Sequence, residues 1–306
     1  MENYTGFIGN KSSRDFLATK EDKARPETFV IINCVLNLPL MLTCILGNAL
    51  VLATIIRSPS IRSPSMIMLC SLAVSDLIVG FIAQPLFIAD ELIKDNLVLY
   101  RVSAMIGFSV CGVSLATITL ISIDRFLAVK YHMRYITLVR QSRVIFIIVM
   151  IWLFTFVCSG FHIWDTFLHH LLSAIYIAIC LIISTFCYIR IYLTVRHHRL
   201  QIQTQQLAVQ CRYAANNTTM MRLKRSALNT FLFYVFMITC YFPAYVLLMI
   251  FGLGYMKWAT EWAIASTVVF MNSSINPILY CWRLRELRVA VVKTVKRVLR
   301  LQGNQD

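Results

Sequence analysis

The sequence predicts an all-α membrane protein, a bundle of seven transmembrane helices followed by a short amphipathic eighth helix. Of the 306 residues, 58% are hydrophobic and only 14% are charged, which is too little charge to cover a soluble domain of this size. The apolar residues gather in seven runs that are uncharged or nearly so: 29–56, 65–89, 102–123, 144–164, 167–189, 226–256 and 262–282. Each run supplies the roughly 20 residues that a helix needs to cross about 30 Å of hydrocarbon, and none shows the strict alternation of a barrel strand.

The distribution of lysine and arginine predicts how this bundle lies in the membrane. The segments after the odd-numbered runs are rich in both, whereas those after the even-numbered runs carry only Lys94, Arg101 and Lys257. Because cytoplasmic loops hold the excess of positive charge, we expect a multi-pass protein of the plasma membrane with its amino terminus outside. The net charge of +15 then faces anionic inner-leaflet lipids, which are expected partners. Nucleic acid is not expected as a partner, because the charge is spread along short loops between spans.

Three regions follow from this topology: an extracellular tail at 1–28, a seven-helix domain at 29–282, and an amphipathic helix with a cytoplasmic tail at 283–306. The first region has no apolar run that could act as a cleavable signal, so the first span is expected to direct membrane insertion. In the last region, leucine and valine lie on one helical face and arginine and lysine mainly on the other. This pattern is typical of a helix on the inner leaflet, and a soluble coiled-coil stub is the alternative.

Glycosylation motifs and cysteines are interpreted through the same topology. The motifs at Asn3 and Asn10 lie in the extracellular tail and are expected to carry glycans. Those at Asn217 and Asn272 fall in a cytoplasmic loop and inside a span, where no glycan is attached. Of the ten cysteines, only Cys211 lies outside the predicted spans, on the cytoplasmic side. We therefore expect no disulfide.

Asp76 is an acidic residue in the middle of the second predicted span, where a charge is costly unless it is paired or neutralised. A carboxylate ringed by hydroxyls and amides suits Na⁺ with water, so we expect sodium as an allosteric ion and no other cofactor. The alternative is a protonated Asp76 in a structural hydrogen-bond network, and the two states could alternate. The oxygen-bearing side chains of other spans that would complete the ion site are Ser114, Asn272, Ser273 and Asn276.

Short motifs occur in a fixed order along the seven runs. They are Gly47-Asn48 in the first, Leu72 to Leu77 in the second, Asp124-Arg125-Phe126 closing the third, Trp152 in the fourth, Tyr188 in the fifth, Cys240 to Pro243 in the sixth, and Asn276-Pro277-Ile278-Leu279-Tyr280 in the seventh. With these motifs, the chain resembles the rhodopsin-like (class A) G-protein-coupled receptors. The resemblance implies a receptor that binds an extracellular ligand inside the bundle and activates a heterotrimeric G protein at its cytoplasmic face, where arrestin is a further partner.

Three departures narrow this resemblance. Tyr100 stands where such receptors have an outer cysteine, the second outer loop is short and free of cysteine, and Cys180 replaces the proline of the fifth span. In these respects the chain is similar to the melanocortin and cannabinoid receptors, whose wider group includes the adenosine receptors. The resemblance does not fix the ligand, because Leu86, Tyr100 and Ala104 stand where melanocortin receptors have acidic residues.

The resemblance also implies roles for individual residues. Asp124 and Arg125 would pair at rest, and Arg125 would be released when the sixth helix moves outward about Pro243. Arg125 would then contact the G protein, together with Met133. The remaining switch residues would be Tyr188, Tyr241, Pro277 and Tyr280, and the Tyr241 hydroxyl needs a partner because it replaces the usual tryptophan. The ligand pocket would be an aromatic, mostly uncharged cavity lined by Phe108, Cys111, Tyr176, Tyr245, Leu248, Trp262, Ser266 and Phe270.

Two other classes of protein are weighed against a receptor. An intramembrane protease would place a reactive serine opposite a histidine, but His162, His169 and His170 gather at the outer edge and no serine has such a setting, so no enzyme is expected. A proton- or cation-coupled carrier is the alternative function, because Asp76 is an ionisable group within a span. Such carriers are normally built from two related halves, and the sequence shows no repeat of this kind.

Overall fold

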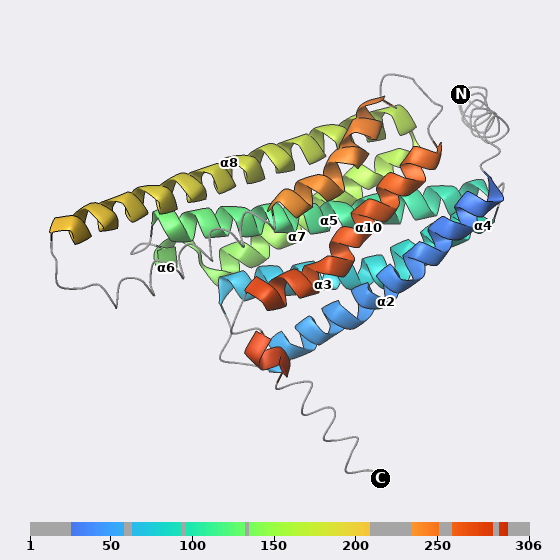
Figure 1. Cartoon of the computed structure of the whole chain (residues 1–306). Helices are drawn as coiled ribbons and strands as arrows, with labels where there is room; N and C mark the ends of the chain where they lie inside the picture. Colours follow the sequence, from blue (N-terminus) through green and yellow to red (C-terminus); the bar gives the residue numbers. More distant parts are fainter. Residues whose placement is uncertain are drawn as a thin grey trace, which may run out of the picture.

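A computed structural model describes residues 26–57, 63–93, 96–131, 135–208, 234–250, 259–283 and 288–292, and all regular structure in these segments is helical. The long helices lie alongside one another in a single bundle (Figure 1). The first span is α2 (Glu27–Arg57), and the third is α5 (Leu97–Lys130). The second span consists of α3 (Pro64–Ile78), the π-helix η2 (Val79–Ala83) and α4 (Gln84–Leu92).

The second half of the bundle begins with the short helix α6 (Tyr135–Leu138). The fourth span is α7 (Gln141–Gly160), which the 3₁₀ turn η3 (Phe161–Ile163) connects to the fifth, α8 (Thr166–Ala208). The sixth is the helix Tyr234–Ile250, and the seventh is α10 (Ala259–Arg283).

These helices match the seven predicted runs. Six are long and apolar enough to cross a membrane, while Tyr234–Ile250, the described part of the predicted run 226–256, is apolar but shorter. The fold class is therefore the predicted all-α membrane bundle. Within the predicted eighth helix and tail at 283–306, helical residues are described beyond α10 at 288–292, so the amphipathic eighth helix stays a prediction.

The pattern of burial is that of a membrane bundle. Large apolar side chains face outward, such as Phe146 and Val157 of α7, whose side chains are 66% and 65% exposed. Polar side chains are buried inside the bundle along with its apolar core, and Asn48, Asp76 and Asn276 have no exposed area. Apolar groups outside and polar groups inside fit a protein whose outer surface meets lipid and whose interior carries its function.

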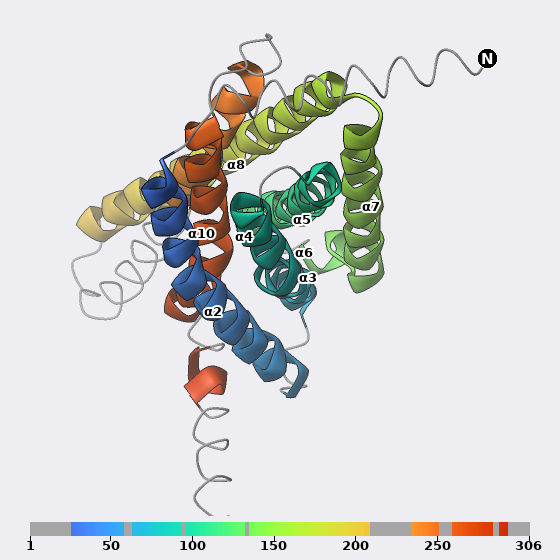
Figure 2. The same ribbon diagram turned by 90° about the vertical axis from the view of Figure 1, so that its right-hand side faces the viewer.

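The central helix of the bundle is α5. It packs against α3, α4, α7 and α8, and Figure 2 shows it between α4 and α7. On another side of the bundle, α2 packs against α10, and Gly47 allows their close approach because a Cβ there would lie 2.8 Å from Cγ of Pro277. Pro277 of the Asn-Pro motif therefore packs directly against the first span.

The second span is interrupted by a π-helix that the sequence analysis did not anticipate. Pro85 lies in the first turn of α4, where its ring crowds the preceding turn and it offers no N–H donor. The chain accommodates it through η2, in which the Gln84 N–H bonds to the Val79 carbonyl five residues earlier. Gly80 in this segment lies against α2, where a Cβ would be 2.8 Å from Cγ1 of Ile45.

Candidate functional site

The Asp76 carboxylate lies fully buried where three spans meet. Its Oδ1 accepts a hydrogen bond of 3.0 Å from the Ser114 hydroxyl of α5, and its Oδ2 accepts one of 2.9 Å from the Asn276 amide of α10. The Ser273 side chain is a further hydrogen-bond partner. The sequence analysis grouped these side chains in the middle of the membrane spans, and the structure joins them in one hydrogen-bond network.

A wider set of polar groups supports this network. The Asn48 amide donates to the Ser273 carbonyl at 3.1 Å, and the Cys44 thiol donates to the Asp76 carbonyl at 3.0 Å. Asn272, the fifth residue of the predicted ion site, is buried, but its Nδ2 has no hydrogen-bond partner within the described segments. Asn272 is therefore not drawn into the hydrogen bonds of the carboxylate.

The donor atoms at this position fit a small hard cation. The side-chain oxygens of Asn48 and Asn276 are buried and accept no hydrogen bond from the residues that the structure describes. Buried acceptors without donors are costly unless water or an ion satisfies them. Two such oxygens near one carboxylate are the chemistry that Na⁺ with water would satisfy.

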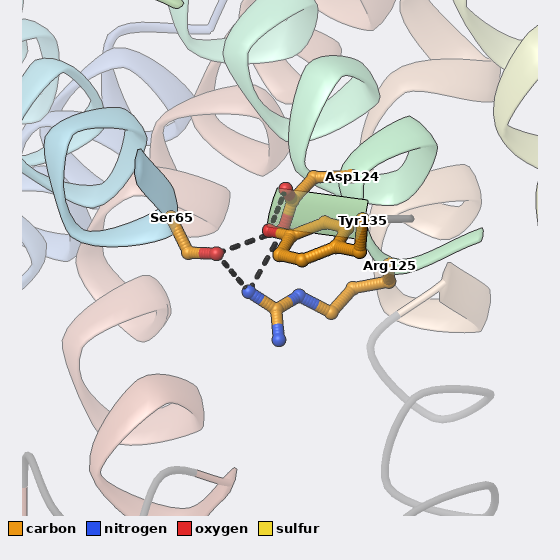
Figure 3. Close-up of polar contacts among 4 residues, drawn as sticks. All are labelled: Ser65, Asp124, Arg125 and Tyr135. Atoms are coloured by element: carbon orange, nitrogen blue, oxygen red, sulfur yellow. Dashed lines mark hydrogen bonds and ion pairs between the residues drawn. The ribbon is translucent and has the colours of Figure 1, made fainter. Parts of the chain in front are cut away.

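A second polar cluster holds Arg125 near the C-terminal end of α5 (Figure 3). Nη2 of Arg125 lies 2.8 Å from Oδ2 of Asp124, whose side chain is only 1% exposed. The Ser65 hydroxyl of α3 donates to the same Oδ2 at 2.9 Å, and Arg125 also donates to the Ser65 oxygen. The Tyr135 hydroxyl of α6 donates to Oδ1 of Asp124 at 2.6 Å.

Ser65 and Tyr135 are functional residues that the sequence analysis missed. Burial and the hydrogen bond to Asp124 raise the pKa of the Tyr135 phenol, so at neutral pH it is protonated and serves as a donor. Asp124 therefore accepts from two segments besides its own helix. The cluster ties the N-terminal end of α3 and the C-terminal end of α5 to α6.

The other predicted switch residues occupy separate positions. The Tyr188 hydroxyl accepts a hydrogen bond of 3.0 Å from Ser122, and the Tyr241 hydroxyl donates to the Cys111 carbonyl at 3.2 Å. That carbonyl is the partner that the Tyr241 hydroxyl was expected to need. Tyr280 is buried in the main apolar core, whereas Pro243 is exposed on the helix Tyr234–Ile250.

The predicted ligand pocket is only partly assembled around one centre. Phe108 stacks on Trp262, with ring centroids 5.7 Å apart and planes 29° apart. The Tyr176 hydroxyl donates to the Gly112 carbonyl at 3.0 Å. Cys111, Tyr176, Tyr245 and Leu248 pack in the same apolar cluster as these two rings.

Two predicted pocket residues are engaged elsewhere. Phe270 belongs to a second apolar cluster and packs edge-on against Phe87, with centroids 5.4 Å apart. The Ser266 hydroxyl donates to the Trp262 carbonyl of its own helix at 2.8 Å. Phe108 also contacts the ring of His169, with a centroid separation of 4.5 Å.

Some predicted features lie outside the described residues, namely Met133, Asn3 and Asn10. The nine cysteines in the described segments are all free thiols, and Cys211 falls outside these segments.

Comparisons with known proteins agree with this architecture. The sequence profile described as 7 transmembrane receptor (rhodopsin family) matches residues 47–167. Melanocortin receptor 4 of Danio rerio is 27% identical over 290 residues, which cover 88% of this chain and 84% of that protein. Melanocortin receptor 5 of Mus musculus is 25% identical over 97% of this chain and 91% of its own. Melanopsin of Homo sapiens is 30% identical over 123 residues, which are 39% of this chain and 25% of melanopsin.

The apolar helix bundle, with a buried carboxylate network and an arginine cluster inside it, is that of a multi-pass membrane protein. The family match over residues 47–167 and these relatives support a rhodopsin-like (class A) G-protein-coupled receptor, with melanocortin receptors among its relatives. It is a receptor that couples an extracellular ligand to a G protein, and not an enzyme. Neither the structure nor the comparisons favour the carrier alternative.

Proposed function

We propose that this receptor lies in the plasma membrane with its amino terminus outside, and that it binds its ligand in the outer half of the bundle around Phe108 and Trp262. The excess of lysine and arginine in alternate loops supports this orientation. The Arg125 cluster then faces the cytoplasm, where inner-leaflet lipids and arrestin are further partners. Asn3 and Asn10 would face the outside and carry glycans.

Recognition of the ligand rests on aromatic contact in this proposal. Phe108 and Trp262 form a stacked pair, and Tyr176 and Tyr245 belong to the same cluster. Leu86, Tyr100 and Ala104 offer no carboxylate at the positions where the related melanocortin receptors have acids. We therefore propose a ligand held by stacking and by hydrogen bonds instead of ion pairs at those three positions.

The observation that carries the signalling proposal is the set of bonds on Asp124. Its carboxylate holds Arg125 by an ion pair while accepting from Ser65 and Tyr135. This arrangement is a resting state in which Arg125 is withheld from the G protein. In the active state the helix Tyr234–Ile250 moves outward about Pro243, and Arg125 moves toward Tyr188 and Tyr280 while Met133 joins the G-protein contact.

We further propose that the Asp76 network holds Na⁺ in the resting state. Asp76, Ser114, Ser273 and Asn276 would hold the ion, and Asn272 would complete the site from one turn away. The ion would neutralise a buried carboxylate that otherwise carries an uncompensated charge. A protonated Asp76 would have the same electrostatic effect after ion release, and Pro277 beside the site gives α10 a point of bending.

The test is nucleotide exchange by purified heterotrimeric G proteins of several classes, with the receptor reconstituted in lipid nanodiscs. Lipids, nucleosides, amines and peptides are added in turn, and Arg125→Ala is the matched control. We expect the wild-type receptor to accelerate exchange on at least one G protein beyond the Arg125→Ala variant. Identical exchange by both proteins under every condition would overturn the assignment of Arg125.

A further inference from the structure

Three histidines form a compact cluster at the junction between α7 and α8. His162 lies in η3, and His169 and His170 lie at the start of α8. Their ring centroids are 4.9, 6.1 and 5.8 Å apart for the pairs 162–169, 162–170 and 169–170. His162 and His169 are 3% and 1% exposed, and His170 is half-buried.

The hydrogen bonds leave basic nitrogens within this cluster. Nδ1 of His169 faces the Cys158 carbonyl at 3.3 Å, so the neutral ring carries its proton on Nδ1 and its Nε2 is the basic atom. That Nε2 has only the long contact of 3.5 Å with the Ser173 hydroxyl. Nδ1 of His162 is buried and has no hydrogen-bond partner in the described part of the chain. Both rings therefore present positions at which a proton can be accommodated.

The cluster is in direct contact with the proposed ligand pocket. Phe108 lies against all three imidazoles, with centroid separations of 6.4, 4.5 and 6.3 Å to His162, His169 and His170. Phe108 also stacks on Trp262, with ring centroids 5.7 Å apart. Because Phe108 contacts both the histidines and Trp262, a new charge or a displacement at the histidines acts directly on the Phe108–Trp262 pair.

The cluster lies far from the inner arginine. Its neighbour Tyr100, whose ring is 5.8 Å from that of His162, is near the start of α5, and Arg125 is near the end of the same helix. A separation of 25 residues along an α-helix corresponds to about 38 Å. On the orientation proposed above, the histidines face the extracellular side.

We propose that this three-histidine cluster is a site at which extracellular protons act on the receptor, because acidification places like charges within it and loosens the α7–α8 junction against Phe108. Imidazole in water is the side chain that changes charge near pH 6.5, and burial makes protonation of these three rings more costly than in water. At separations of 5–6 Å, two imidazolium rings repel each other strongly in a buried setting. This inference rests on the proposed function in one respect: the proposed orientation of the receptor is what makes the protons extracellular.

Charged groups of both signs lie around the cluster. Arg101 of α5 acts electrostatically on His162 together with the other two histidines, so it adds a further positive charge. Asp90 of α4 acts on Tyr100, where Arg101 opposes it. The Asp165 carboxylate accepts from the Leu168 N–H at 3.0 Å at the start of α8. From α7, the Cys158 carbonyl faces His169. From α10, the uncharged ring of Trp262 lies on the far side of Phe108.

The first experiment measures the apparent melting temperature of the purified ligand-free receptor between pH 7.5 and pH 5.5, at one scan rate. Histidines of the unfolded chain are far apart and take up protons below about pH 6.5 without this repulsion, so stability falls as pH falls. Each extra proton bound by the unfolded chain changes the folding constant by up to about tenfold per pH unit. We expect His162→Asn/His169→Asn to lose much of the acid-induced drop that the wild-type protein shows.

The control is His197→Asn, the same substitution on an exposed histidine at the inner end of α8, which should behave as wild type. If the double variant does not fold, the half-buried His170 allows His170→Asn to be tested alone. A pH dependence that is unchanged in the cluster variants would overturn the proposal. This measurement requires neither a G protein nor a particular orientation, so its failure is distinct from failure of the proposed function.

The second experiment shows from which side of the membrane protons act on the receptor. Cells expressing the receptor are held at an external pH of 7.4 or 5.5 with the cytoplasmic pH monitored, and ligand-free signalling is measured at matched surface expression. External acid should change the signal of wild type and His197→Asn and leave His170→Asn less responsive. An equal response in all three proteins would contradict a role for the cluster in the receptor's output.

Discussion

Replacing Tyr135 with phenylalanine removes one hydroxyl from the inner cluster and retains the ring. The lost bond is the 2.6 Å donation to Oδ1 of Asp124, and a hydrogen bond to a charged group contributes about 1.5–3 kcal/mol. Because Tyr135 is only half-buried, the lower end of that range applies. If the bond exists in the resting state alone, the resting state loses about 1.5 kcal/mol, which shifts the equilibrium toward the active state about tenfold.

The assay is ligand-free nucleotide exchange by the G protein at equal amounts of receptor. Tyr135→Phe should raise the basal rate by up to about tenfold, and Ser65→Ala should raise it as well because Ser65 bonds to both members of the ion pair. Tyr192→Phe is the matched control, since Tyr192 is 57% exposed. An unchanged or lower basal rate in Tyr135→Phe, with Tyr192→Phe at the wild-type rate, would refute the assignment of Tyr135 to the resting state.

Two further predictions concern the bundle interior. Sodium should stabilise the ligand-free receptor more than an equal concentration of choline, by about 0.8 kcal/mol at three times its dissociation constant. This difference is roughly 2 °C in melting temperature, and Asp76→Asn should abolish it; equal effects of both salts would exclude the ion site. Gly47→Ala should cost about 1–3 kcal/mol, because its Cβ would lie 2.8 Å from Cγ of Pro277. The control Gly107→Ala has nothing within 4 Å of its Cβ, so a melting temperature lowered equally in both variants would contradict the packing argument.

The bilayer explains why much of the fold could be predicted from the sequence. A helix that crosses hydrocarbon must be long, apolar and nearly free of charge, so its position can be read from composition alone. The same rule exposes polar exceptions, which is why Asp76, Ser114 and Asn276 could be grouped before any geometry was known. Asn272 was assigned to the same group by depth, but its amide does not bond to the carboxylate because depth does not determine side-chain direction.

The π-helix, the Tyr135–Asp124 bond and the histidine cluster could not be predicted from the sequence, because they depend on how the helices pack and how the loops turn. Pro85 is visible in the sequence, but the π-helix that accommodates it and the close packing of Gly80 against α2 are not. Tyr135 of α6 lies beside the Asp124 carboxylate (Figure 3), a contact that depends on how the chain turns between α5 and α6. His162 joins His169 because the connection through η3 is short. In each case a loop or an interhelical contact, and not the hydrophobic pattern, sets the position of the residue.

The arrangement of these sites on α5 gives a physical route between them. Phe108 lies in the proposed ligand pocket, the Cys111 carbonyl accepts from Tyr241, and Ser114 donates to Asp76. Further along, Ser122 donates to Tyr188, and Asp124 holds Arg125. From Phe108 to Asp124 the helix rises about 24 Å, and the hydrogen bonds to Tyr241, Asp76 and Tyr188 each join α5 to a different helix. A ligand that shifts α5 or the helix Tyr234–Ile250 must therefore remake the Tyr241 bond, and this rearrangement can alter the Asp76 network and the resting Asp124–Arg125 pair along one rigid element.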